Sequence, residues 1–499
     1  MRFAAGEAGL VGCATVDEQL FETDSMAVAP PPTSEKGPVA RTFRAYDPDQ
    51  VLLMPPSLAD WLPEDHLAHF VSELVDEVLD LGPFLASYTE VRGYPPYDPR
   101  LMLKILLYGY TKGVRSSRRI EVCCQEDVAF RFLAGNCAPD YRSIARFRKR
   151  HLAALEGLFV QPLRLCQQAG MVTMGRVALD GTKVRANASR HKAMSYDRMV
   201  RAEQDLADEV ARMMADAQRI DEEEDARFGP DERGGDLSGE MARRESRLAK
   251  IRSAKDDLER HAREAAAAAA REKAAKTAQN GGDVDVEVLA EQAARDARPA
   301  PKAQRNFTDP DARIMKTADG SFHYAYNAQA VVDEDNQVII ATDFAESGAD
   351  CPALPQMLDQ AIANTGSTPG QTLADAGYFS AANVRAATTR RTDPLIATGR
   401  LKHGDTVPDT PPGPAPTNAT PKQAMAYKLR TEQGKAAYSR RKVIVEPVFG
   451  QMKTTQHAGQ LLLRGRDNAR AEWRLLAACH NLRTLFRFQY GTIATPATA

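Results

Sequence analysis

The chain has 499 residues, enough for about three or four domains, and its 43% hydrophobic and 26% charged residues are typical of a globular protein. Its seven cysteines form no C-x-x-C pair, which excludes a disulfide framework or a structural zinc site and predicts a reduced environment. Because the first residues lack a signal-peptide pattern and no apolar run reaches membrane-span length, we expect a soluble, cytoplasmic protein.

The formal net charge of −2 conceals two basic segments. Residues 92–151 hold thirteen Lys and Arg against five Asp and Glu, a net of +8, and residues 428–487 hold thirteen against four, a net of +9. Two such segments in a near-neutral chain indicate a polyanionic partner, most simply nucleic acid. The alternative is a pair of solvated helix faces.

Residues 1–43 contain "APPPTSEKGP" and are expected to form a disordered tail. Residues 44–168 have the apolar spacing of helices, and both "DPRLMLKILLYGYTKG" and "PDYRSIARFRKRHLAAL" begin with an Asp that can cap a helix. This segment is predicted to be an all-helical DNA-binding domain, although a helical bundle with a basic exterior fits the pattern equally well. The predicted DNA contacts on its last helix are Arg146, Arg148, Lys149 and Arg150.

The stretch "GRVALDGTKVRANA" changes to a strand pattern and is expected to end a short strand at Asp180. Residues 195–300 return to helix and are predicted to form an antiparallel hairpin or coiled coil, with "RFGPDERGGD" as its turn. A spacer, a dimer contact and a DNA clamp are all open as its role. Its heptad positions are Met199, Leu206, Val210, Met213, Ala217 and Ile220, then Met241, Leu248, Ile251, Leu258 and Ala262.

Residues 301–488 predict the rest of a mixed α/β domain that begins at residues 169–194. "SFHYAYNAQAVVD" and "QVIIATDFA" read as a β-hairpin, "CPALPQMLDQAIANT" as a helix, "QTLADAGYF" as a strand ending at Asp375, and "DPLIAT" as a further strand. Asn327 and Gln329 either face a site or form hydrogen bonds within the sheet. Basic helices follow, and residues 489–499 are expected to be a disordered tail.

Glu446 stands alone in "VIVEPVFGQMK" between basic residues. Because Pro447 suits a first helical turn, we expect a helix that starts near Val445. Glu446, Gly450, Lys453 and His457 would then share one face of that helix, and Val445, Val448, Phe449 and Met452 another. A surface salt bridge is the ordinary interpretation of this pattern.

Asp180, Asp375 and Glu446 are therefore three isolated carboxylates, two of them expected at strand ends, where ligands of such sheets bind. Brought together, they would repel one another unless a divalent cation held them, and oxygen ligands suit Mg²⁺ or Mn²⁺. Two such ions about 3.5–4 Å apart are suited to phosphodiester chemistry.

Several motifs in order resemble bacterial insertion-sequence DDE transposases of the group with a Y-R-E-K signature. They are "ALDGTKVRANAS", "TDPDARIM", "YNAQAVVD", "LADAGYFS" and "YSRRKVIVEPVFGQMK", together with the helical segment before them and "LRGRDNARAEWRLLAACHNLRTL" after them. The resemblance covers about residues 43–488. It implies an RNase H-like catalytic domain, formed by residues 169–194 and 301–488, that carries the helical insertion.

The resemblance also implies that Asp180, Asp375 and Glu446 form the catalytic, metal-binding triad for two Mg²⁺ ions, with Mn²⁺ as a substitute. Tyr438, Arg441 and Lys453 match the other signature positions and would contact DNA. Four residues separate Arg441 from Glu446, one more than usual, so Arg440 or Lys442 could share its role.

The expected function is cleavage of element ends by metal-activated water, followed by joining of the 3′-hydroxyl to target DNA. The expected partners are double-stranded DNA, at terminal inverted repeats and at the target, and a second copy of the chain when it is bound to DNA. The bound protein is expected at the nucleoid. The alternatives are a metal-dependent nuclease without strand transfer and a transposase-derived DNA-binding protein without catalysis.

Overall fold

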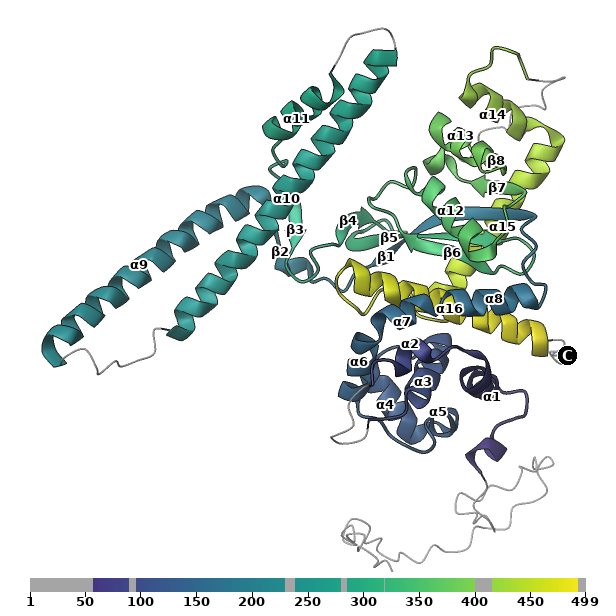
Figure 1. Cartoon of the computed structure of the whole chain (residues 1–499), viewed down its shortest axis with the longest axis horizontal. Helices are drawn as coiled ribbons and strands as arrows, with labels where there is room; N and C mark the ends of the chain where they lie inside the picture. Colours follow the sequence, from purple (N-terminus) through teal and green to yellow (C-terminus); the bar gives the residue numbers. More distant parts are fainter. Residues whose placement is uncertain are drawn as a thin grey trace, which may run out of the picture. The chain divides into compact units, whose positions relative to one another are not determined.

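The computed structural model describes residues 57–88, 96–228, 238–279, 285–317, 319–399 and 415–491 (Figure 1). The predicted tail at 1–43, the start of the helical segment at 44–56, the predicted turn "RFGPDERGGD" almost entirely, and residues 492–499 lie outside this part. Residues 489 and 490 were expected in the C-terminal tail but belong to the last helix. In the described part, no helix has the length and apolar character needed to cross a membrane.

The described elements between residues 57 and 168 are all helical, as predicted. Asp98 and Asp140 cap α3 and α6 by accepting hydrogen bonds from backbone N–H groups. The single helix expected after Asp140 is in fact two, because His151 leaves the helical conformation between α6 and α7. The helices are α1 (Leu67–Glu73), α2 (Gly82–Leu85), α3 (Pro99–Lys112), α4 (Ser117–Glu126), α5 (Val128–Leu133), α6 (Tyr141–Arg150), α7 (Leu152–Gly157) and α8 (Val160–Gln168).

A six-stranded mixed sheet follows, with the order β4-β5-β1-β7-β8 and with β6 also paired to β5. The parallel strands are β1, β7 and β8, whereas β5 runs antiparallel to β1, β4 and β6. The predicted hairpin and strands are confirmed, and β4 was not predicted. The strands are β1 (Arg176–Arg185), β4 (Arg313–Lys316), β5 (Phe322–Asp333), β6 (Ile339–Phe344), β7 (Gln371–Ala374) and β8 (Asp393–Ile396).

Helices pack against this sheet and confirm the mixed α/β class. Helix α12 (Ala353–Thr365) packs on β5 and β6, α13 (Ala381–Thr389) and α14 (Pro421–Arg430) pack beside β8, and α15 (Glu432–Thr454) crosses β1, β5 and β7. Helix α16 (Arg466–Tyr490) lies between β6 and the N-terminal helices α3, α7 and α8 (Figure 1).

Helix α15 corrects the expected start near Val445, because Pro447 lies well inside the helix. A proline removes the N–H that would bond to the carbonyl four residues earlier, here that of Val443. The Gln337 side chain supplies the missing donor, with its Nε2 2.9 Å from the Val443 oxygen. The apolar face is buried as predicted, but His457 lies beyond the end of α15 and does not share the face of Glu446.

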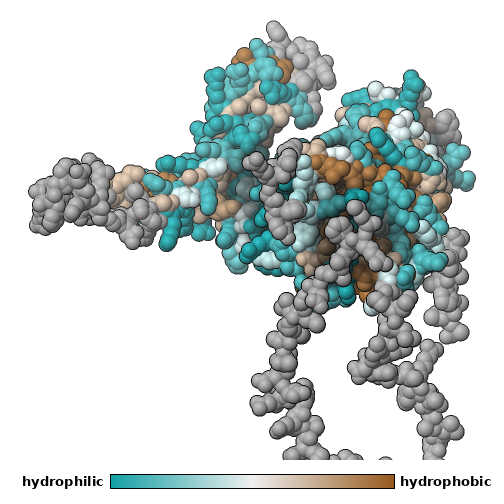
Figure 2. All heavy atoms as spheres, turned by 60° about the horizontal axis from the view of Figure 1, so that its bottom comes forward, coloured by the Kyte–Doolittle hydropathy of each residue, from teal (hydrophilic) through white to brown (hydrophobic). Residues whose placement is uncertain are grey.

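The insertion consists of α9 (Tyr196–Phe228), α10 (Ser238–Gln279) and α11 (Val286–Asp296). As the heptads predicted, α9 packs on α10, through a separate apolar cluster that includes Met199, Leu206, Leu248 and Ile251. Helix α10 continues beyond this pair to Gln279, and α11 packs along it. The paired strands β2 (Ala193–Ser195) and β3 (Gln304–Asn306) join the two ends of the insertion. Figure 2 shows mostly hydrophilic residues on the insertion, with small apolar patches.

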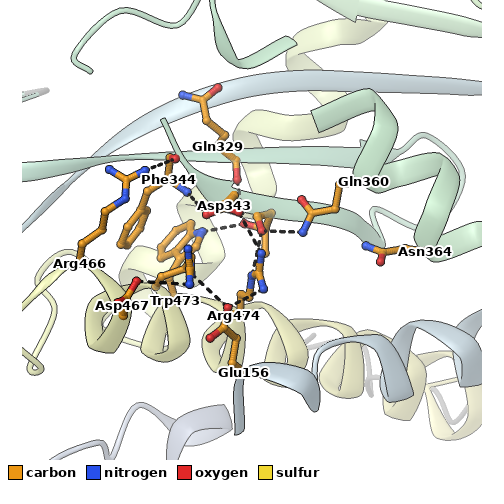
Figure 3. A network of polar contacts seen from close by, with 12 residues as sticks. Glu156, Gln329, Asp343, Phe344, Gln360, Asn364, Arg466, Asp467, Trp473 and Arg474 are labelled. Carbon is orange, nitrogen blue, oxygen red and sulfur yellow. Dashed lines mark hydrogen bonds and ion pairs between the residues drawn. The ribbon is translucent and has the colours of Figure 1, made fainter. Parts of the chain in front are cut away.

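One hydrophobic core extends from Leu67 to Leu485 and includes the N-terminal helices, the sheet and α16. Trp473 of α16 is fully buried in it, and its Nε1 donates to Thr342 Oγ1 at 2.7 Å. Figure 3 shows Arg474 between Glu156 of α7 and Asp343 of β6. Its Nη1 lies 2.6 Å from Glu156 Oε1, and its Nη2 lies 2.9 Å from Asp343 Oδ2. The N-terminal helices therefore share a core with the sheet instead of having one of their own.

Candidate active site

The pairing of β1 with β7 brings two of the predicted carboxylates together. Leu179 and Ala374 form the last parallel pair, so Asp180 and Asp375 are the next residues on neighbouring strands. Asp180 does not end its strand as expected, because β1 continues to Arg185 in its pairing with β5. Burial raises the pKa of the Asp180 carboxyl; nearby Arg441 opposes this effect and the negative charge of Asp375 adds to it.

The Asp375 carboxylate is positioned by the turn that follows β7. Its Oδ1 accepts a hydrogen bond from the N–H of Gly377 at 2.8 Å and so caps the short helical turn Ala376–Tyr378. The Asp180 Oδ1 accepts from the N–H of Gly181, also at 2.8 Å. Both side chains are thus held by backbone donors where the pairing of β1 with β7 ends.

Helix α15 carries the third carboxylate, Glu446, and also Arg441, which lies near both Asp180 and Glu446. The Arg441 Nη1 lies 2.9 Å from Asp180 Oδ2, and its Nη2 lies 3.8 Å from Glu446 Oε1. The Arg441 side chain is only 11% exposed, whereas that of Glu446 is 54% exposed. Burial by itself lowers the pKa of Arg441, but Asp180, Tyr438 and Asp375 raise it overall, so the guanidinium stays charged among the acids.

The donor chemistry of Asp180, Asp375 and Glu446 fits a divalent cation, since all are carboxylates and all interact with one positive group. The positive group beside these carboxylates is the Arg441 guanidinium. Among the residues that the structure describes, no three His, Cys, Asp or Glu side chains are arranged to hold a metal ion.

Lys453 lies on the same side of the sheet. Its Nζ donates a hydrogen bond to Thr182 Oγ1, and Thr182 is two residues after Asp180 on β1, so their side chains point to the same face. Burial lowers the pKa of Lys453. Tyr438 is partly buried against the core, and burial raises the pKa of its hydroxyl.

Two segments of the chain match known protein families. Residues 56–150 match a transposase domain of otherwise undescribed function, and residues 296–482 match the transposase DDE domain. The chain belongs to the insertion-sequence DDE transposases. No curated protein and no solved structure matches it.

The transposase's signature has one extra residue between Arg441 and Glu446, but Arg441 still contacts the carboxylates. Arg440 turns to Glu334, with Nε and Oε1 2.7 Å apart, and Lys442 is exposed to solvent. Of these three neighbours in α15, Arg441 is the one whose guanidinium contacts Asp180 and Glu446.

Sequence reasoning missed a fourth carboxylate of the transposase, Asp350. Its Oδ1 accepts from Asn327 Nδ2 at 2.7 Å and from Gln329 Nε2 at 3.1 Å, and it forms an ion pair with Lys183 at 3.1 Å. A β carbon added at Gly377 would lie 3.0 Å from Asp375 Oδ1 and 3.4 Å from Asp350 Oδ2, so the two carboxylates are neighbours. Nothing in the surrounding sequence, "ESGAD", distinguishes Asp350 as a site residue.

The open question about Asn327 and Gln329 is answered by the same contacts. They pair with Lys183 and Gly181, and so lie on the sheet face opposite Asp180 and Thr182. Gln329 Oε1 also accepts a hydrogen bond from the buried hydroxyl of Tyr378, which follows Asp375 by three residues. These two amide side chains therefore lie behind β1, on the face opposite Asp180, and Gln329 also contacts the turn that follows Asp375.

The basic side chains of helix α6 are of two kinds, buried and exposed. Arg148 is buried and donates to Tyr110 Oη at 3.0 Å, to the Arg115 carbonyl at 2.9 Å and to Ser117 Oγ at 2.5 Å, which contradicts its expected role in binding DNA. Arg146 and Lys149 are exposed. Arg150 is also exposed but stacks over the Tyr88 ring and donates to the Ser87 carbonyl.

Proposed function

We propose that this DDE transposase binds the ends of its element, cleaves a phosphodiester bond there and joins the freed 3′-hydroxyl to target DNA. The observation that carries the proposal is the convergence of Asp180, Asp375 and Glu446 on one buried positive group. Carboxylates that repel one another, gathered around one cation, are the donor set of magnesium-dependent phosphoryl transfer.

The three carboxylates are proposed to hold two Mg²⁺ ions, with Mn²⁺ as a substitute. The ions would supply activation of the attacking oxygen and neutralisation of charge on the leaving oxygen. Asp180 and Asp375 are positioned for this by the β1–β7 pairing, and Glu446 by the packing of α15 on that pair. An RNase H-like fold is proposed for residues 169–194 and 301–488, with residues 195–300 as its insertion.

The remaining site residues are proposed to hold DNA. Lys453 presents its amine beside Thr182, on the face of the sheet that carries Asp180, and Arg441 has the planar fork that matches a phosphate. Tyr438, one turn before Arg441, would pack against the backbone of the bound end. Arg146, Lys149 and Arg150 on α6 are proposed to contact duplex phosphates, and Arg148 is withdrawn from that set because it is buried.

The test uses Asp180→Asn, Asp375→Asn and Glu446→Gln, each of which keeps shape and removes a ligand charge. We expect each to abolish cleavage of a labelled end in Mg²⁺ while end binding and the far-ultraviolet circular dichroism stay unchanged. Asp359→Asn and Glu432→Gln make the same chemical changes at surface positions, one paired with Arg390 and one at the start of α15. They should leave cleavage intact.

Wild-type cleavage by a folded triad variant would remove that residue from the site. A second assay gives the wild-type protein paired ends and a target plasmid. Joined products support transposition, whereas cleavage without joining would favour a nuclease.

A further inference from the structure

The position of Arg441 carries an inference beyond contact with DNA. Its guanidinium contacts Asp180 at 2.9 Å and approaches Glu446 at 3.8 Å. Each oxygen of Asp180 already accepts a hydrogen bond, Oδ1 from the Gly181 N–H and Oδ2 from Arg441. A metal ion that bound Oδ2 on the side where Arg441 lies would therefore have to displace the guanidinium.

The other cations near the carboxylates are engaged elsewhere. Lys453 donates to Thr182, and Lys183 pairs with Asp350 on the opposite face of the sheet. Arg441 is also incompletely satisfied, since its buried Nε has no hydrogen-bond partner in the described part of the chain. A guanidinium with a vacant donor suits a new acceptor that offers two oxygens, as a phosphate does.

We propose that Arg441 is the resident counter-cation of the metal-free site, and that it exchanges Asp180 for a DNA phosphate when metal enters. This inference rests on the proposed function. Metal and DNA would then bind cooperatively, because each removes an obstacle to the other: DNA draws the guanidinium away from the carboxylates, and metal frees it for the phosphate. Metal affinity would be low until an end is in place.

The experiment measures Mn²⁺ binding to the full, DNA-free chain by the electron paramagnetic resonance signal of free Mn²⁺. Arg441→Gln removes the counter-cation, and Arg440→Gln removes the neighbouring charge, which pairs with Glu334. We expect Arg441→Gln to tighten Mn²⁺ binding by about tenfold or more, since a largely buried pair no longer has to be broken. Arg440→Gln, at a more exposed pair, should change it by about threefold or less.

A second measurement adds an uncleavable end duplex. The duplex should tighten Mn²⁺ binding to the wild type by a larger factor than to Arg441→Gln, in which the obstacle is already gone. If Arg441→Gln does not fold, Arg441→Lys keeps the charge but loses the planar fork that reaches both acids, and a gain above that of Arg440→Gln is still expected.

Equal Mn²⁺ affinities for the Arg441 and Arg440 variants would overturn the inference, because they would show only a general charge effect. Failure of the proposed function gives a different result. In that case Asp180→Asn would bind Mn²⁺ as the wild type does, or the wild type would show no saturable site with or without DNA.

Discussion

Replacing Lys453 with Met separates a role in DNA binding from a role in folding. The Lys453 amine donates to Thr182 Oγ1 and forms no ion pair with an acid among the described residues, Glu446 included. Methionine keeps the apolar stem and removes the charge. Because burial lowers the pKa of Lys453, the charged form is costly in the folded protein, and its loss should not destabilise it.

The expected change in the free energy of unfolding at pH 7 therefore lies within about 1 kcal/mol of zero, because removal of the partly buried charge offsets loss of the hydrogen bond to Thr182. The pH dependence has a definite sign. The folded-state pKa is below the ordinary 10.5, so the folded state binds fewer protons than the unfolded state in the window just below 10.5. Wild-type stability should rise with pH across that window, and the rise should be absent in Lys453→Met.

DNA binding, in contrast, should become weaker in Lys453→Met. Loss of one charged contact to a phosphate should weaken binding of an element end by about ten- to a hundredfold, which corresponds to the roughly 1.5–3 kcal/mol of a charged hydrogen bond. The slope of log affinity against log salt should fall by about 0.9. Lys442→Met, an exposed lysine on the same helix, is the matched control and should leave stability unchanged. Destabilisation of Lys453→Met by 1 kcal/mol or more, with unaltered end binding, would refute the assignment.

Three further predictions follow from buried or close contacts. Burial lowers the pKa of His480 to about 4, so stability should fall by about 2 kcal/mol between pH 7.5 and 5, and urea titrations of His480→Gln should lack that loss. Gly113→Ala should cost about 1–3 kcal/mol, because Gly113 has a φ of +80° and an added β carbon would lie 2.5 Å from the Thr455 oxygen; an unchanged urea midpoint would contradict this. Arg146→Ala should lower the salt slope of end binding by about 0.9, whereas Arg148→Met should leave the slope unchanged and cost about 1–3 kcal/mol of stability.

Local patterns predicted most of the secondary structure correctly because each signal acts within a few residues. Asp98 and Asp140 cap helices as their positions indicated, and the alternation around Asn327 gave the long strand β5. The expected start of α15 was wrong because a proline normally breaks a helix interior. Gln337, more than one hundred residues away, supplies the replacement donor, and no local pattern carries that information.

The candidate site was likewise predictable only where local sequence carried the information. Asp180, Asp375 and Glu446 stood out as lone acids in apolar or turn contexts, and the sheet places the first two side by side. Asp350 could not be found, because its neighbours Asn327, Gln329 and Gly377 are assembled only by strand pairing. The expected DNA contact of Arg148 failed for a related reason. Helical spacing alone did not show that this arginine of the basic helix turns inward to Tyr110 and Ser117.

The shared core connects the N-terminal helices physically with the end of α15. Arg115, just after α3, forms a buried ion pair with Glu472 of α16 at 3.0 Å and donates to the carbonyls of His457 and Gln460. Those carbonyls belong to the segment that follows Lys453 and pairs with Arg185 at the end of β1.

The other oxygen of Glu472 accepts the N–H groups of Leu462 and Leu463, both at 2.8 Å. A buried pair held at both ends is costly to disrupt, so a displacement of the N-terminal helices would strain the segment between α15 and α16 instead of sliding past it. Because Arg148 of α6 donates to the Arg115 carbonyl, the same network links α6 to the end of the helix that carries Arg441, Glu446 and Lys453.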